Sequence, residues 1–210
     1  MIRILFFDIG YTLIDESAVW EQRCREQAQT AEAKRLGLSA ADIRREIERA
    51  SAERKPQYRT VVEKYRFREV APYRHAYETL YEDAPRVLCA LSHKAALGVI
   101  ANQTDGLRKR LERFGILSYF TCIVSSWDVG VMKPEGRIFE IALDRAGCLP
   151  EEAVMIGDRL DNDIAPAKAV GMKTVWVRQG FGACQTPSSQ ADTPDYTVNC
   201  LADLPALPLF

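Results

Sequence analysis

Short, uninterrupted apolar runs recur along the chain, and they do not alternate with polar residues. A strand that is buried on both faces reads in this way, so the pattern predicts a parallel sheet covered by helices. The predicted strands are Ile2–Phe7, Ala96–Ala101, Phe120–Ser125, Ala153–Ile156, Lys173–Val177 and the short Tyr196–Val198. Helical patterns separate the later strands, at Leu107–Phe114, Arg137–Ala146 and Ile164–Val170. Strands and helices that alternate in this order are typical of an α/β fold.

The segment 16–82 departs from this pattern. It contains a single glycine, Gly37, shows no convincing strand, and reads as helices rich in Glu, Arg and Gln at Ala18–Leu36, Ala40–Lys55 and Tyr58–Arg68. Ser39 is placed to cap the second helix, with Asp42 in its first turn. The segment leaves and returns beside the end of the first strand, so we expect it to lie over that end.

The expected fold is therefore α/β, a Rossmann-like parallel sheet with helices on both faces and an inserted α-helical cap. Residues 1–15 and 83–210 would form the core (catalytic) domain, and residues 16–82 the helical cap domain.

Composition narrows the classes of function. The 210 residues carry a formal net charge of −1, which provides no global field to attract nucleic acid or an anionic membrane. No apolar run approaches about 20 residues and the N-terminus shows no signal region, so we expect a cytoplasmic protein without a membrane span. The six cysteines are scattered without a Cys-x-x-Cys pair, and we expect them to be buried free thiols. The oligomeric state is left open.

Aspartates follow two of the predicted strands. Asp8 comes directly after Ile2–Phe7, and Asp158 and Asp163 follow Ala153–Ile156. The carboxyl ends of parallel strands meet at one edge of a sheet, where open α/β folds bind ligands. Carboxylates that converge there repel one another unless a hard cation holds them, and Mg²⁺ prefers such oxygen ligands together with substrate phosphate. The sequence therefore predicts metal-assisted chemistry on a phosphate.

Four motifs, in this order, resemble those of haloacid dehalogenase-like phosphohydrolases with a helical cap, similar to the phosphoglycolate phosphatase-like subfamily. They are Phe-Phe-Asp8-Ile-Gly10-Tyr-Thr12-Leu, Gly-Val-Ile-Ala101-Asn102-Gln103, Val-Met-Lys133-Pro134-Glu-Gly-Arg-Ile-Phe139, and Gly157-Asp158 with Asp163 five residues on. Each motif alone has a simpler interpretation, such as a turn cap for Asp8 or a solvated side chain for Lys133. Their order and spacing along an α/β pattern make the combination specific.

The resemblance implies a Mg²⁺-dependent phosphatase that acts on a small phosphorylated metabolite through an aspartyl-phosphate. Asp8 would be the nucleophile, and the ammonium of Lys133 would neutralise its charge and that of the phosphate. The residues implied to hold the metal are Asp8, Gly10 through its carbonyl, Asp158 and Asp163. Those implied to bind the phosphate are Thr12, Asn102, Gln103 and Lys133.

Two positions depart from the family's pattern. Gly10 stands where the family usually has a second aspartate, which protonates the leaving oxygen and later activates water, and Ala101 stands where Ser or Thr normally contacts the phosphate. General acid–base help contributes ~10²–10⁴ in rate, so we expect turnover that is slow or limited to activated phosphates. The alternative is a catalytically silent relative that binds phosphate or a protein partner. A 2-haloacid dehalogenase is disfavoured, because that chemistry needs an apolar halide site and no metal.

Overall fold

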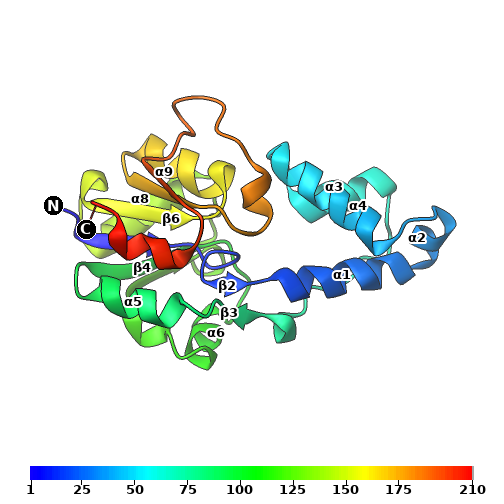
Figure 1. Cartoon of the computed structure of the whole chain (residues 1–210), viewed down its shortest axis with the longest axis horizontal. Helices are drawn as coiled ribbons and strands as arrows, with labels where there is room; N and C mark the ends of the chain where they lie inside the picture. The colour runs from blue at the N-terminus through cyan, green and yellow to red at the C-terminus, as the bar shows by residue number, and fades with distance from the viewer. Residues whose placement is uncertain (210) are drawn as a thin grey trace.

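A six-stranded parallel sheet forms the centre of the structure, a computed structural model that describes residues 1–209 (Figure 1). The strand order is β5-β4-β1-β6-β7-β8. The strands are β1 (Ile4–Phe7), β4 (Ala96–Ala101), β5 (Phe120–Ser125), β6 (Ala153–Gly157), β7 (Lys173–Val177) and β8 (Tyr196–Val198). Each overlaps a predicted strand, although β1 begins two residues later and β6 ends one residue later than predicted. The α/β fold with a parallel sheet is confirmed.

Both faces of the sheet are covered. Leu5 and Phe7 of β1 lie in one apolar core, while Ile4 and Phe6 lie in another, because successive side chains of a strand point to opposite faces. The helices on the first face are α5 (Ala84–Ser92) and α6 (Leu107–Arg113), and those on the second are α8 (Gly136–Ala146) and α9 (Ala165–Val170). The unbroken apolar run of β1 therefore reflects burial on both sides, as predicted.

The segment 16–82 supplies four helices and one edge of a small antiparallel ribbon. The helices, called the cap helices below, are α1 (Ser17–Gln29), α2 (Ala31–Arg35), α3 (Ala40–Ala52) and α4 (Gln57–Tyr65). The ribbon pairs β2 (Ile14–Asp15) with β3 (Thr79–Leu80). The expectation of no strand in this segment was wrong at β3, because two residues are too few to show a strand periodicity.

The helix predicted over Ala18–Leu36 is two helices. The backbone is extended at Thr30, whose hydroxyl accepts a hydrogen bond from the amide of Ala33 and so caps α2. A threonine side chain that bonds to the backbone competes with helix continuation, which accounts for the break. The remaining short elements are η1 (His75–Tyr77), η2 (Leu117–Tyr119), α7 (Ser126–Val129), η3 (Pro150–Glu152), the π-helical turn η4 (Leu160–Ile164), η5 (Gly180–Cys184) and η6 (Leu201–Ala206).

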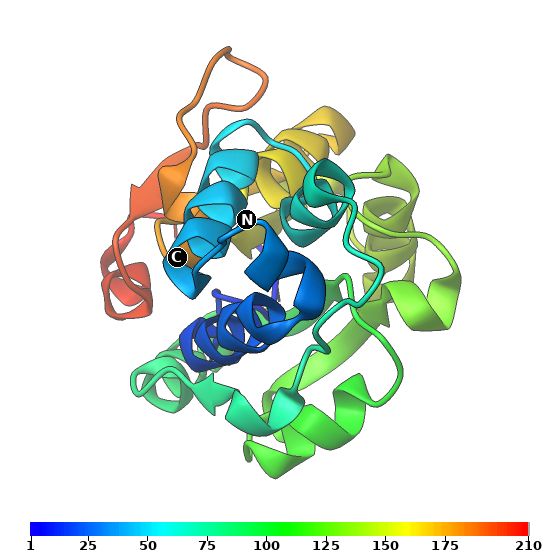
Figure 2. The same ribbon diagram turned by 90° about the vertical axis from the view of Figure 1, so that its right-hand side faces the viewer.

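The cap helices pack on an apolar cluster that includes Trp20, Ile43 and Ile47, and that Tyr11 and Phe181 join from outside the segment 16–82. In Figure 1 they lie at the end of the molecule opposite both chain termini, and in the turned view of Figure 2 they stand in front of the sheet. They therefore lie beyond the edge of the sheet at which β1 ends. Among residues 1–209, none of the helices combines the length and apolar character of a membrane span.

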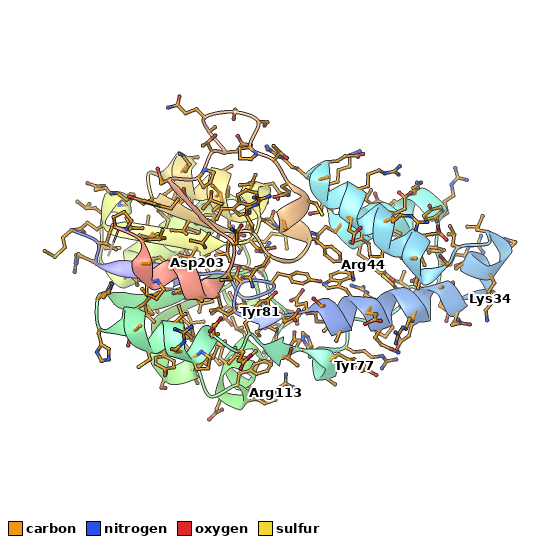
Figure 3. The ribbon with its side chains drawn as sticks, in the orientation of Figure 1. Lys34, Arg44, Tyr77, Tyr81, Arg113 and Asp203 are labelled. Atoms are coloured by element: carbon orange, nitrogen blue, oxygen red, sulfur yellow. The ribbon has the colours of Figure 1, made fainter. Side chains whose placement is uncertain are left out.

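The segment around η5 joins the cap helices to the sheet. The hydroxyl of Ser51 donates to the carbonyl of Phe181 (2.8 Å), and the side chain of Gln185 donates to the carbonyl of Ser51 (3.0 Å). Arg44 of α3 points toward this segment (Figure 3), with its guanidinium carbon 5.4 Å from the centre of the Phe181 ring. Arg54 forms an ion pair with the buried Asp192. These contacts hold α3 against the loop that follows β7.

The cap of α3 gives the first prediction. Ser39 caps α3 as predicted, and together with Asp42 it forms a capping box: the Ser39 hydroxyl accepts from the Asp42 amide (3.2 Å), and the Asp42 carboxylate accepts from the Ser39 amide (2.9 Å). Ser39→Ala should lower the free energy of unfolding by about 1 kcal/mol, measured by urea denaturation. Ser92→Ala is the control, since that exposed hydroxyl donates to the Cys89 carbonyl at a helix end. Equal losses in both variants would contradict the capping role.

Candidate metal and phosphate site

The candidate site lies where three neighbouring strands end. Asp8 follows β1, Asn102 follows β4 and Asp158 follows β6, and β1 lies between the other two strands in the sheet. The amide of Asp8 donates to the carbonyl of Ile156 (2.9 Å), which fixes the first residue beyond β1. From β1 the chain proceeds to β4 and β5 on one side, then crosses to β6 on the other. This reversal opens a crevice at the carboxyl edge of the sheet.

Lys133 lies between two of the predicted carboxylates. Its ammonium is 2.5 Å from Asp8 Oδ1 and 2.6 Å from Asp163 Oδ1, and the residue is 3% exposed. The side-chain amide of Asn102 donates to the Lys133 carbonyl (2.8 Å) and accepts from the Lys133 amide (2.7 Å). Asn102 therefore fixes the backbone of the lysine. The sequence predicted it as a phosphate ligand and did not anticipate this contact.

Asp163 reaches the site from the π-helical turn η4. Its Oδ2 accepts from the amide of Arg159 (3.0 Å), and the ammonium of Lys133 contacts its other oxygen. A Cβ at Gly157 would lie 2.5 Å from the Asp163 carboxyl carbon, so the last residue of β6 must be glycine for this carboxylate to approach. The indole of Trp176 donates to the Asp158 carbonyl (2.6 Å) and holds the backbone between the two aspartates.

The three carboxylates of Asp8, Asp158 and Asp163 form one buried cluster. One oxygen from each lies within 4.8 Å of the others. Burial raises the pKa of Asp158 well above its usual range, and the charges of Asp163 and Asp8 raise it further. Burial would lower the pKa of Lys133, but the same two neighbouring carboxylates outweigh it and the net shift is upward.

The ammonium of Lys133 cannot balance three carboxylates in a buried site, and the nearby Arg159 guanidinium is already paired with Asp161. The surplus negative charge and the all-oxygen donor set suit a divalent cation, which would relieve the repulsion that raises the Asp158 pKa. The residues present therefore fit a divalent metal.

A cavity of about 140 Å³ opens onto this cluster. The predicted site residues on its wall are Asp8, Gly10, Asn102, Gln103, Lys133, Asp158 and Asp163. Five residues outside the predicted set of site residues join them, namely Tyr11, Glu16, Gln57, Arg159 and Asn162. Thr12 does not line the cavity. Its hydroxyl is buried and has no hydrogen-bond partner within residues 1–209.

A second, larger cavity of about 510 Å³ adjoins the first. The two share Glu16, Asn102 and Gln103, and the larger is also lined by Tyr73, His75, Thr104, Ser126 and Met132. Its size suits the organic part of a small phosphorylated molecule. The side-chain oxygen of Gln103 accepts from Arg110, so this shared residue is held from the α6 side.

Glu16 is the residue that sequence reasoning missed. Its Oε2 accepts a hydrogen bond from the indole of Trp20 (3.0 Å). Burial raises the pKa of Glu16 to about 7; hydrogen bonds from Tyr73 and Trp20 oppose this rise, while the charge of Asp8 adds to it. No motif marks the residue, because it lies at the start of the helical segment. The one available signal was the position of the Glu16 carboxylate, close in sequence to the loop in which Gly10 replaces the second aspartate of the family pattern.

Comparisons with known proteins give three findings. The family model described as haloacid dehalogenase-like hydrolase matches residues 5–177. A glyceraldehyde 3-phosphate phosphatase of Methanocaldococcus jannaschii is 39% identical over 137 residues, covering 63% of this chain and 54% of that protein. A phosphoserine phosphatase of Thermus thermophilus is 32% identical over 127 residues, covering 60% and 49%. These alignments span about half the length of the curated relatives.

Solved structures are similar over nearly the whole chain. The crystal structure of a HAD phosphatase from Thermococcus onnurineus has a TM-score of 0.66 and 26% identity, and the match covers 97% of this chain and 96% of that one. The magnesium-bound HAD-hydrolase YfnB from Bacillus subtilis has a TM-score of 0.68 at 23% identity, covering 97% and 96%. The latter likeness concerns the fold alone.

The buried lysine gives the second prediction. Lys133→Met removes the positive partner of Asp8 and Asp163 and should lower the free energy of unfolding by about 3–5 kcal/mol in the absence of divalent ions. Lys133→Met combined with Asp163→Asn should be less destabilised than the single variant, because one buried charge is then removed. Urea denaturation with a chelator present measures both.

Lys34→Met is the matched control, since Lys34 is exposed on α2 at the far end of the cap helices (Figure 3). A stability loss at Lys133 no larger than that at Lys34 would show that the ammonium does not neutralise the cluster.

Proposed function

Because the chain belongs to the haloacid dehalogenase-like hydrolase family, we propose that it is a Mg²⁺-dependent phosphatase that uses an aspartyl-phosphate on Asp8. The observation that carries the proposal is the Asp8 carboxylate, in contact with the Lys133 ammonium and within reach of Asp158 and Asp163 on one cavity wall. The relatives named as phosphatases support a phosphate ester as substrate. A small phosphorylated metabolite fits the two adjoining cavities.

In the proposed reaction, each residue has a role that follows from its charge. An Asp8 oxygen attacks phosphorus and becomes the acyl phosphate oxygen, a step that repulsion between two anions would otherwise oppose. Lys133, already bonded to Asp8, offsets charge on that carboxylate and on the phosphate oxygens. Mg²⁺, when held by Asp8, the Gly10 carbonyl, Asp158 and Asp163, supplies the charge that stabilises the transferring phosphoryl group.

In this proposal residues 1–15 and 83–210 form the catalytic domain, and residues 16–82 form a cap domain over the site. The apolar cluster of the cap helices supports the division, because most of its buried residues belong to the segment 16–82. Gln57 at the start of α4 supports the position of the cap, because it lines the same cavity as Asp8. The cap then encloses the organic part of the substrate. A cytoplasmic location and the lack of a nucleic-acid or membrane partner are kept as part of the proposal.

The third prediction concerns the nucleophile. With Mg²⁺ present, the protein should hydrolyse p-nitrophenyl phosphate, and Asp8→Asn should reduce the rate by about 10³-fold or more because an amide cannot form the acyl phosphate. Release of p-nitrophenolate measures the rate. Removal of divalent ions with a chelator should abolish turnover, and added Mg²⁺ should restore it.

Asp144→Asn, on the exposed side of α8, is the matched control and should keep full activity. Folded, Mg²⁺-loaded protein that turns over neither p-nitrophenyl phosphate nor acetyl phosphate would favour the silent relative instead.

A further inference from the structure

We propose that the carboxyl group of Glu16 is the general acid and base of the reaction, protonating the leaving oxygen and later taking a proton from the attacking water. This inference rests on the proposed function and extends it. An alkyl phosphate leaves as a strongly basic alkoxide, so its cleavage requires a proton at the bridging oxygen as that bond breaks. The group that supplies it must lie between the phosphate and the organic part of the substrate.

Glu16 lies at that boundary. The smaller cavity holds the nucleophile Asp8, and the larger one adjoins it and can hold the organic group. Among the described residues, those on the walls of both cavities are Glu16, Asn102 and Gln103. A carboxamide neither ionises nor becomes protonated near neutral pH, so Glu16 alone of these three can act as an acid and a base.

The two carboxylate oxygens of Glu16 have different surroundings. Oε2 is held by the indole of Trp20 (3.0 Å), which fixes the orientation of the carboxyl group. Oε1 faces Gly10, two residues beyond the nucleophile: a Cβ built on Gly10 would lie 2.5 Å from Oε1 and 3.0 Å from the carboxyl carbon. The Glu16 carboxyl group therefore occupies the space that a side chain at position 10 would need. The carboxyl group of Glu16 thus fills the space that is left by the missing side chain of Gly10.

The other titratable groups of the larger cavity are less suitable. The Tyr73 hydroxyl lies between two carboxyl groups: it donates to Glu78 Oε1 (3.1 Å) and is also within hydrogen-bonding contact of Glu16. His75 Nδ1 is 2.9 Å from the same Glu78 oxygen. Both are bound to a buried carboxylate, and neither lines the cavity that contains Asp8. Their position suits contact with the organic group of the substrate.

The two steps balance as follows. In the first, an Asp8 oxygen forms a bond to phosphorus, the bond between phosphorus and the ester oxygen breaks, and the ester oxygen takes the Glu16 proton to leave as an alcohol. In the second, a water oxygen bonds to phosphorus while Glu16 accepts the water proton, and the bond from Asp8 to phosphorus breaks. Inorganic phosphate is released, and both carboxyl groups return to their initial state.

Glu16→Gln tests the role, and it supplies the fourth prediction. Glutamine keeps the shape of the side chain and an acceptor for Trp20, but it cannot donate an acid proton. The kcat/KM for glycerol phosphate should fall by ~10²–10⁴-fold. With p-nitrophenyl phosphate the first turnover should remain fast, because p-nitrophenolate leaves without a proton, while the second step should be slow. A burst of about one equivalent of p-nitrophenolate per protein should therefore precede slow turnover.

Glu21→Gln is the control, since Glu21 is an exposed carboxylate on the same helix α1, paired with Arg25. It should leave both substrates unaffected. If Glu16→Gln hydrolyses glycerol phosphate at the unaltered rate, the proposal is overturned. An equal loss of the first aryl turnover and of alkyl turnover would also overturn it, because that pattern indicates a structural role.

Moving the carboxyl group from position 16 to position 10 gives an independent test. Gly10→Asp alone should lower activity, since its side chain meets the Glu16 carboxylate at 2.5 Å. In the Glu16→Ala background, Gly10→Asp should instead raise hydrolysis of glycerol phosphate, because it returns a carboxyl group to the same space. An effect of the same sign in both backgrounds would refute the shared position. If the double variant does not fold, the burst in Glu16→Gln decides.

Failure of this role and failure of the phosphatase itself give different results. If the unaltered protein releases p-nitrophenolate in an Asp8-dependent reaction and Glu16→Gln leaves hydrolysis of both substrates unaffected, the role of Glu16 alone is refuted. Unaltered protein with no Asp8-dependent release of p-nitrophenolate refutes the phosphatase, and the role of Glu16 with it.

Discussion

The contact on which the rest of the site depends is the buried Lys133 ammonium between Asp8 and Asp163. These residues come from the loop before α8, the end of β1 and the turn after β6, and this contact joins all three. Buried charges are tolerated only when they are paired and hydrogen-bonded, so each group restricts where the others can lie. Asn102 adds the fourth anchor, since its amide holds the lysine backbone from the end of β4. The ion pairs at this edge of the sheet therefore fix the position of Asp8, the proposed nucleophile, before any substrate binds.

Much of this arrangement could be predicted from the sequence because it depends on where strands end. Continuous apolar runs locate the strands, and a polar residue directly after such a run must lie at the carboxyl edge. Asp8, Asn102 and Asp158 satisfy this rule, and the structure places them on neighbouring strands. The start of a helix could be predicted equally well where an N-capping residue is present, as Ser39 is at the start of α3. Strand ends and caps are local properties, so a local pattern reveals them.

The remaining features depend on contacts between distant residues. Two-residue strands such as β3 carry no periodicity, and the helix break at Thr30 depends on one hydroxyl that bonds to the backbone. The direction of a side chain is equally hidden: Thr12 follows Asp8 closely, yet its hydroxyl is buried away from the cavity wall. Asn102 lies at the expected edge, but it holds a neighbouring loop. Sequence spacing fixes which residues come near the site, whereas packing decides which atoms face it.

Glu16 shows why a missing motif residue does not by itself imply a missing group. General acid catalysis requires a carboxyl group beside the bond that breaks, and any residue whose side chain extends to that position can provide the group. Glycine at position 10 is then a requirement of the Glu16 side chain, because a larger residue would collide with it. The proposed catalytic groups are therefore positioned by two different parts of the structure. Asp8 and Lys133 are fixed by the sheet, while Glu16 precedes α1 and is oriented by Trp20, which packs in the core of the cap helices. In the proposed reaction, proton transfer by Glu16 therefore depends on how the cap helices pack against the sheet, whereas the position of Asp8 depends on the sheet edge.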